Sequence, residues 1–162
     1  MKEAYEKAAQ GMESVTPTTL APGMRIHHFA DTGNPKGYFT GRWWVGFSPF
    51  EALEQYSTSR GVPLPLAARQ CLAIDQTYTA RLDILVTVVL KQALSAWSGT
   101  PKTQVVTRSP ASARVSLRPS KTITQLCIPG LDQKSPTNPA LMIWQSAFGN
   151  QTCQRLEGDA GT

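Results

Sequence analysis

Residues 41–56 read GRWWVGFSPFEALEQY, and this stretch decides the local fold of the chain. Its first half continues the aromatic, β-prone run Tyr38–Phe47, which predicts a strand. Ser48 is the expected N-cap of a helix, with Pro49 in the first helical position and Glu51 three residues after the serine, as in a capping box. The stretch therefore predicts a strand that runs directly into a capped helix.

Apolar and turn-forming residues predict the other elements around this unit. The helix is expected to stop near Ser59–Gly61, because glycine favours the left-handed conformation that ends helices. The run Asp83–Ala93 is β-branched and apolar on both faces, which predicts a central strand. A short helix is expected at Glu3–Met12, and a helix turning into a strand at Leu66–Ile74. Further strands are expected at residues 24–29, 103–106, 113–117 and 122–128, and a strand or helix at 140–148.

Together these elements predict an α+β fold, with a small mixed or antiparallel sheet and about two helices in a single compact domain. A length of 162 residues is typical of one domain. We expect that domain at residues 24–148. Residues 1–23 are expected to form a partly ordered lead-in and residues 149–162 a flexible tail, because both segments offer little apolar surface to bury.

The composition is that of a globular protein, with 41% hydrophobic and 17% charged residues. Cys71, Cys127 and Cys153 lack zinc-ligand spacing, and an odd number of cysteines without a disulfide pattern indicates a reducing compartment. The first residues lack the apolar core of a signal peptide, and the longest apolar run, Ile84–Leu90, is too short to span a bilayer. We therefore expect a cytoplasmic protein with no membrane partner.

The whole chain has a net charge of +5, and basic residues dominate its middle part. No acidic residue occurs from Ile84 to Leu131, and a stretch of one sign attracts nucleic acid, phosphates or an acidic protein. A nucleic-acid or target interface in the span 91–121 would use Lys102, Arg108, Arg114, Arg118 and Lys121. A solvated basic loop explains the same pattern. An accessory protein that occludes a partner surface is a further alternative.

The chain lacks the most specific catalytic motifs. Neither a GxxxxGK[ST] phosphate loop nor a GxGxxG sequence is present, which argues against ATP hydrolysis and a Rossmann cofactor site. His27 and His28 are the only histidines, and as neighbours on a strand they point to opposite faces. Without an HxxxH or HExxH pattern we expect no metal site. A Ser–His–Asp triad that includes Ser48 is an alternative, although no GxSxG elbow supports it.

Four short segments resemble a degenerate mono-ADP-ribosyltransferase of the Arg–Ser–Glu type. They are GMRIHHF with Arg25, VGFS followed by a helix, LSAWSG at Leu94–Gly99, and TITQLCIPG around Gln125. The resemblance extends over residues 24–130. It implies an NAD-dependent protein of the toxin or effector type that modifies a macromolecular target. Both an active enzyme and an inactive protein are compatible with it.

The resemblance assigns roles to individual residues. Arg25 would contact the NAD phosphates and ribose, and Ser48 would hold the strand pair. A literal Ser-Thr-Ser sequence at Ser57–Ser59 lies at the expected helix end and is the second choice. Gln125 falls where the family has its catalytic glutamate. A glutamine keeps the hydrogen bond to the ribose but lacks the charge that stabilises an oxocarbenium-like transition state.

NAD binding also has physical requirements that can be matched to residues. A pyrophosphate needs a cation and backbone N–H donors, which Arg25 and the start of the following helix would supply. We group His27 with Arg25, as the histidine of the pair that would face a cleft. The candidates for an aromatic platform under the nicotinamide are Trp43, Trp44, Phe47 and Tyr56. A core position for one tryptophan and a loop or interface position for the other explains the pair without a ligand.

Overall fold

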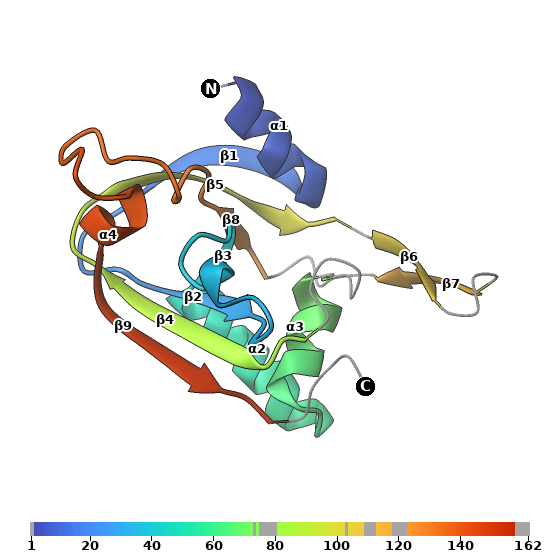
Figure 1. The fold of residues 1–162 in the computed structure, drawn as a ribbon. Helices are drawn as coiled ribbons and strands as arrows, with labels where there is room; N and C mark the ends of the chain where they lie inside the picture. The colour runs from blue at the N-terminus through green and yellow to red at the C-terminus, as the bar shows by residue number, and fades with distance from the viewer. Residues whose placement is uncertain are drawn as a thin grey trace.

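An antiparallel sheet of seven strands, with helices packed against it, organises the chain (Figure 1). The computed structural model describes residues 2–72, 74, 81–102, 104–108, 113–117 and 123–157. In chain order the elements are α1 (Lys2–Gly11), β1 (Met12–Leu20), β2 (Arg25–Ala30), a 3-10 turn (Pro35–Gly37), β3 (Trp43–Gly46), α2 (Phe47–Arg60), α3 (Leu64–Leu72), β4 (Ile84–Leu90), β5 (Leu94–Pro101), β6 (Gln104–Arg108), β7 (Ala113–Leu117), β8 (Gln125–Cys127), α4 (Ile143–Ala147) and β9 (Phe148–Arg155). The predicted α+β class is confirmed. Among the described residues, α1, α2 and α3 make three substantial helices where about two were expected.

The strands lie in the order β1-β5-β8-β3-β2-β4-β9, and each neighbouring pair is antiparallel. Strands β6 and β7 form a separate two-stranded ribbon, which projects from the sheet at the right of Figure 1. Strand β4, the strongest strand signal in the sequence, is paired on both sides, with β2 and β9. Its position inside the sheet agrees with its apolar character on both faces.

The two ends of the chain form the two edges of the sheet. Residues 1–23, expected as a lead-in, contribute α1 and the edge strand β1. Residues 149–162, expected as a flexible tail, contribute most of the opposite edge strand β9, while 158–162 lie outside the described residues. An edge strand needs few buried positions, and β1 is buried only at Met12 and Leu20. The polar sequence of such a strand gives little of the alternation that predicts strands.

Helix α2 begins two residues earlier than predicted. The prediction of Ser48 as N-cap is wrong, because Gly46 still pairs with Ile26 in the sheet and the chain turns into the helix immediately after it. Gly46 is itself the N-cap, with an extended backbone (φ −78°, ψ −177°). Ser48 and Pro49 are the second and third helical residues, where the proline still removes no helical hydrogen bond. At the other end Gly61 takes the predicted left-handed conformation (φ 64°).

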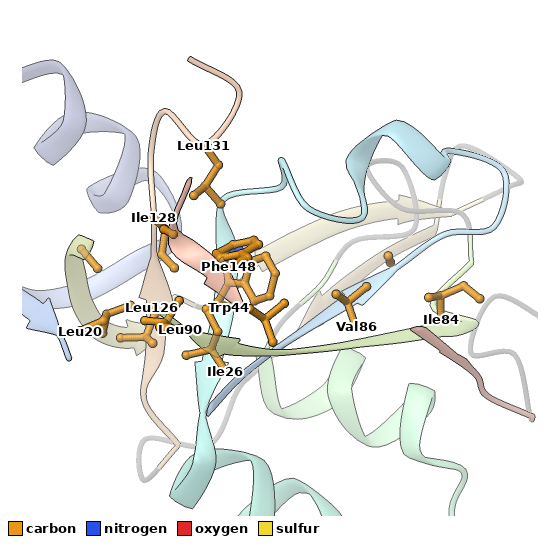
Figure 2. Close-up of a cluster of buried hydrophobic side chains, with 14 residues drawn as sticks. Leu20, Ile26, Trp44, Ile84, Val86, Leu90, Leu126, Ile128, Leu131 and Phe148 are labelled. Carbon is orange, nitrogen blue, oxygen red and sulfur yellow. The ribbon is translucent and has the colours of Figure 1, made fainter. Parts of the chain in front are cut away.

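The two larger hydrophobic cores lie on opposite faces of the sheet. Figure 2 shows the first core, whose labelled members are Leu20, Ile26, Trp44, Ile84, Val86, Leu90, Leu126, Ile128, Leu131 and Phe148. The second core consists of Phe29, Val45, Phe50, Leu53, Ala68, Cys71, Leu72, Leu82, Leu85 and Ile123, and it includes residues of α2 and α3. Successive strand residues face opposite ways, so neighbours such as Trp44 and Val45 enter different cores. The two helices therefore cover one face of the sheet.

Candidate functional site

Backbone pairing arranges three polar residues in one row across the sheet. His27 lies opposite Val45 of β3 and opposite Thr87 of β4. The β3–β8 register puts Gln125 beside Val45 on the other side of β3. Directly opposite residues of antiparallel strands point to the same face. His27, Thr87 and Gln125 therefore share the face that α2 and α3 cover.

This face of the sheet ends at the corner where β2 and α2 both begin. The last ladder pair of β2 and β3 joins Ile26 to Gly46, so Arg25 and Phe47 are the next residues on either side. Arg25 and Ser48 are exposed, and Phe47 leaves 50% of its surface open to solvent. Arg25, Phe47 and Ser48 together form what we term the corner site. Residues from two separate predicted elements thus meet at one exposed end of the sheet.

The corner site has a positive electrostatic character. The N–H groups of the first helical turn have no partner within the helix, and the helix dipole adds partial positive charge there. The first turn of α2 contains no acidic residue. Arg25 pairs with Val89 of β4, and the exposed Lys91 follows two residues later at the same end of the sheet. An arginine, a lysine and a helix N-terminus in one region suit an anionic group.

His27 lies behind the corner site and is buried, with 5% of its surface exposed. Its Nδ1 is 3.0 Å from the Thr87 Oγ1 in a hydrogen bond, and its ring stacks on Phe50. Its Nε2 is buried without a hydrogen-bond partner among the described residues. Burial, together with the positive charge of Arg25, lowers the pKa of His27 to about 4. The imidazole is therefore neutral at physiological pH.

Gln125 and Arg25 share a face but are not neighbours. They lie on strands two positions apart and differ by two residues along the strand direction, which puts their Cα atoms about 12 Å apart. Gln125 is buried, with 5% of its surface exposed, whereas Arg25 is exposed. Arg25, Ser48 and Gln125, to which the resemblance assigns roles at one NAD site, thus divide into an exposed pair and a buried glutamine.

Trp44, predicted as an aromatic platform, is a core residue. Only 1% of its surface is exposed, and its Nε1 donates a 2.7 Å hydrogen bond to the carbonyl of Gly41. Its ring meets Phe148 edge-on, with 5.3 Å between the centroids (Figure 2). The alternative interpretation, a structural role for this tryptophan, accounts for all of these contacts. Among the four aromatic candidates, Phe47 is the one whose ring is largely exposed.

Tyr56, Ser57 and Ser59 occupy the last turns of α2 and serve its local structure. The Tyr56 hydroxyl donates to Gln70 of α3 at 3.1 Å. The Ser57 hydroxyl donates to the carbonyl of Val62 at 2.6 Å, and the Ser59 hydroxyl to the carbonyl of Tyr56 at 3.3 Å. Nine residues of helix separate Ser57 from Ser48, a distance of about 13 Å along the axis. The structure therefore does not bring these three residues to the corner site.

The basic span is only partly described. The Lys102 ammonium donates a hydrogen bond to the carbonyl of Ala9. This contact links the residue that follows β5 to helix α1. Arg108 and Arg114 lie on β6 and β7, next to each other along the ribbon, where Thr107 pairs with Arg114. Arg118 and Lys121 lie outside the described residues. The projecting ribbon thus carries two of the predicted cations, and Lys102 lies at its base.

The described part of the chain contains neither a cluster of metal ligands nor a membrane-spanning helix. No group of three His, Cys, Asp or Glu side chains lies together there as a metal site would require. No helix in the same part is both long and apolar enough to cross a membrane.

Thr87 was not among the predicted site residues. The only available signal was a single polar residue in the apolar strand sequence ILVTVVL. Its partner His27 is 60 positions away, so the pair becomes visible only with the strand register. Comparisons with known proteins add no further assignment: no family model, no curated protein and no solved structure matches this chain.

Proposed function

We propose that this protein is ADP-ribosyltransferase-like and binds NAD at the corner site. The observation that carries the proposal is the Ile26–Gly46 pair, which puts the exposed Arg25 and the first residues of α2 at the same end of the sheet. A dinucleotide presents a pyrophosphate, which is recognised by a guanidinium and by free backbone N–H groups. Both kinds of donor are available at this corner.

Phe47 supports a dinucleotide over a simple phosphate. A nicotinamide or an adenine is a flat ring that stacks on an aromatic side chain. Phe47 lies between Gly46 and Ser48 at the start of α2, and half of its surface is open. The corner therefore combines phosphate donors with a ring platform, and Ser48 adds an exposed hydroxyl as a hydrogen-bonding group.

The glutamine at position 125 favours a protein that binds NAD over one that transfers ADP-ribose efficiently. Its neutral amide lacks the negative charge that stabilises an oxocarbenium-like transition state. Its side chain is also buried, and strand geometry puts its Cα about 12 Å from the Cα of Arg25. We therefore propose an NAD-binding protein with weak or absent transfer to a macromolecular target. The unpaired cysteines support a location in the cytoplasm.

Isothermal titration calorimetry with NAD and with ADP-ribose tests the proposal. Arg25→Ala is expected to weaken binding of both ligands about 10- to 100-fold, because a charge-assisted hydrogen bond is lost. Lys134→Ala is the matched control, since Lys134 is an exposed cation in the loop before α4. Equal affinities of the wild type and both variants would place the ligand elsewhere, and no binding by the wild type would reject the proposal.

A second candidate function is nucleic-acid binding, and the projecting ribbon favours it. Arg108 is the last residue of β6 and Arg114 the second residue of β7, in the ribbon that projects from the sheet (Figure 1). A basic two-stranded ribbon fits the major groove of duplex DNA. A salt titration with a short DNA duplex tests this function, because phosphate contacts give affinity that falls steeply with salt. Double substitution of Arg108 and Arg114 by alanine should reduce that salt dependence.

A further inference from the structure

Strand β9 is a free edge of the sheet. Residues 150–155 are all exposed, and no described strand pairs with their outer side. The strand sequence FGNQTCQR contains no proline, no lysine and no acidic residue. Proline, lysine and bulges are the usual devices that prevent one sheet edge from pairing with another. From Gln151 to Arg155 the strand carries none of the three, and the register shift in its pairing with β4 lies before this segment, between Phe148 and Gln151.

The opposite edge, β1, is protected in several ways. It contains Pro17, and its pairing with β5 is interrupted between Glu13 and Thr16. Ser14, inside that interruption, has a positive φ of 53°. These features bend and blunt the edge, so that a further strand cannot add in register. Of the two edges of the sheet, β9 is therefore the one to which another strand can add.

Hydrogen bonds to β4 determine which groups of β9 remain free. The Leu156 N–H donates to the carbonyl of Asp83 at 2.7 Å, directly after the Arg155–Ile84 pair. Hydrogen-bonded and non-bonded pairs alternate in an antiparallel ladder. Gln151, Cys153 and Arg155 are therefore the residues whose N–H and C=O groups point away from β4, toward solvent.

We propose that β9 pairs antiparallel with β9 of a second copy of this chain, about a two-fold axis at Cys153. In this register each Cys153 lies opposite the other, and Gln151 lies opposite Arg155 of the second copy. The three outward-facing residues of one copy then meet the same three of the other, which gives about six backbone hydrogen bonds. The result is a continuous sheet through both copies with a self-complementary interface.

Charge favours a second copy over an acidic peptide as the occupant of this edge. Arg155 is the only charged residue of β9, and it lies near enough to Asp83 to help lower the pKa of that carboxyl. The edge therefore offers an acidic strand a single cation. In the proposed register it faces an amide, so no like charges meet. One strand pair is a small interface, and we expect a weak, concentration-dependent dimer.

Sedimentation velocity over a concentration series tests the pairing. Gln151→Pro removes an outward N–H but no bond to β4, so it should shift the protein to the monomer. Gln151→Ala is the matched control and should keep the wild-type association. If the Gln151→Pro variant loses its native circular dichroism, the Gln151→Arg variant is used in its place. Gln151→Arg puts an arginine opposite Arg155 of the second copy and should weaken association several-fold. A wild type that stays monomeric throughout, or a dimer that both Gln151→Pro and Gln151→Arg leave unchanged, overturns the proposal.

Cross-linking tests the register. Cys153 is exposed whereas Cys71 and Cys127 are buried, so a short bis-maleimide reports on Cys153. Opposite residues in a bonded pair have Cα atoms about 5.5 Å apart, which is within reach of such a reagent. We expect a cross-linked dimer at concentrations where sedimentation shows association, and none in Cys153→Ser. A dimer by sedimentation without this cross-link would mean that another surface pairs.

Discussion

The imidazole of His27 lies nearly parallel to the ring of Phe50, with 3.9 Å between the ring centroids and 17° between the planes. This stack joins the central strand β2 to the first turns of α2. It also fixes the imidazole in a buried position, where Nδ1 bonds to Thr87 and Nε2 has no hydrogen-bond partner among the described residues. A charged imidazole would be poorly solvated there, so the contact has a direct consequence for stability.

Acid should destabilise the protein through His27. Its pKa is about 4 in the folded protein and about 6.5 in the unfolded chain, so the unfolded state binds more protons between these values. The contribution to stability is complete above about pH 6.5 and is lost as the pH falls toward 4, by up to about 1.4 kcal/mol per pH unit. Burial also lowers the pKa of His28, which acts in the same direction.

Urea denaturation at about pH 7, 6 and 5 measures this dependence. His27→Gln does not titrate in the window and should therefore show a shallower loss of unfolding free energy than the wild type. Identical pH profiles for the two proteins would show that His27 does not contribute.

A second acid-sensitive contact joins Thr32 to Asp83. The Thr32 hydroxyl donates to the Asp83 carboxylate at 2.6 Å and the Thr32 N–H donates at 3.0 Å. Burial alone would raise the pKa of Asp83, but these hydrogen bonds outweigh it and the pKa is lowered. Thr32→Val should cost about 1–3 kcal/mol of unfolding free energy near neutral pH, because a buried carboxylate loses a donor.

Thr40→Val provides the matched control for this prediction. The Thr40 hydroxyl also donates a hydrogen bond, at 2.7 Å to the carbonyl of Lys36, but this bond is exposed. We expect a change within about 0.5 kcal/mol. The difference between the two variants should disappear at acid pH, where Asp83 is protonated in both states. A loss in Thr32→Val no greater than in Thr40→Val would contradict the assigned role.

Only one of the three thiols should react with a small thiol reagent in the native protein. Cys153 is exposed, whereas Cys71 and Cys127 are buried. Burial raises the pKa of Cys127 to about 11, so little reactive thiolate is present. Ellman titration should therefore count one thiol before denaturant and three after it. Rapid reaction of more than one native thiol would show that the cores around the buried cysteines open.

The strongest local signals in the sequence predicted the central part of the fold. Strand β4 and helix α2 were recognised because each has a long, regular pattern, and Gly61 ends the helix as expected. Strand β5 was not among the predicted strands, because its sequence LSAWSGTP contains glycine, serine and proline, which favour turns. It is nevertheless an inner strand, paired with β1 and β8, and these non-local pairings have no local sequence signal.

The candidate site shows the same division. The resemblance assigned Arg25 and Ser48 to one site, and the Ile26–Gly46 pair puts both residues at the same end of the sheet. The burial of Gln125 and the bond between His27 and Thr87 were not predicted. Both depend on the strand order, which places β8 beside β3 and β4 beside β2. Sequence patterns indicate which residues face the core but not which distant strand lies beside them.

Gly99 should not tolerate a side chain. A Cβ at this position would lie 2.6 Å from the carbonyl oxygen of Glu13 and 3.1 Å from the Met12 Cβ. Because the closest atom belongs to backbone, β1 would have to move away from β5. We expect Gly99→Ala to cost about 1–3 kcal/mol, seen as a lower midpoint of thermal unfolding. Gly33→Ala is the control, since its Cβ would meet only the side chain of Asp31, at 3.1 Å. Equal midpoints for the two variants would be inconsistent with the close approach of β1.

Gln125→Glu separates binding from catalysis at the proposed NAD site. A carboxylate at this buried position should lower the unfolding free energy at neutral pH, by about 1–3 kcal/mol. It also supplies the negative charge that an oxocarbenium-like transition state needs, so release of nicotinamide from NAD should rise about 100-fold if Gln125 is near the ribose. Gln10→Glu, at an exposed position of α1, should change neither property. NAD binding without any gain in nicotinamide release would keep the corner site as the ligand site and show that Gln125 is not near the ribose.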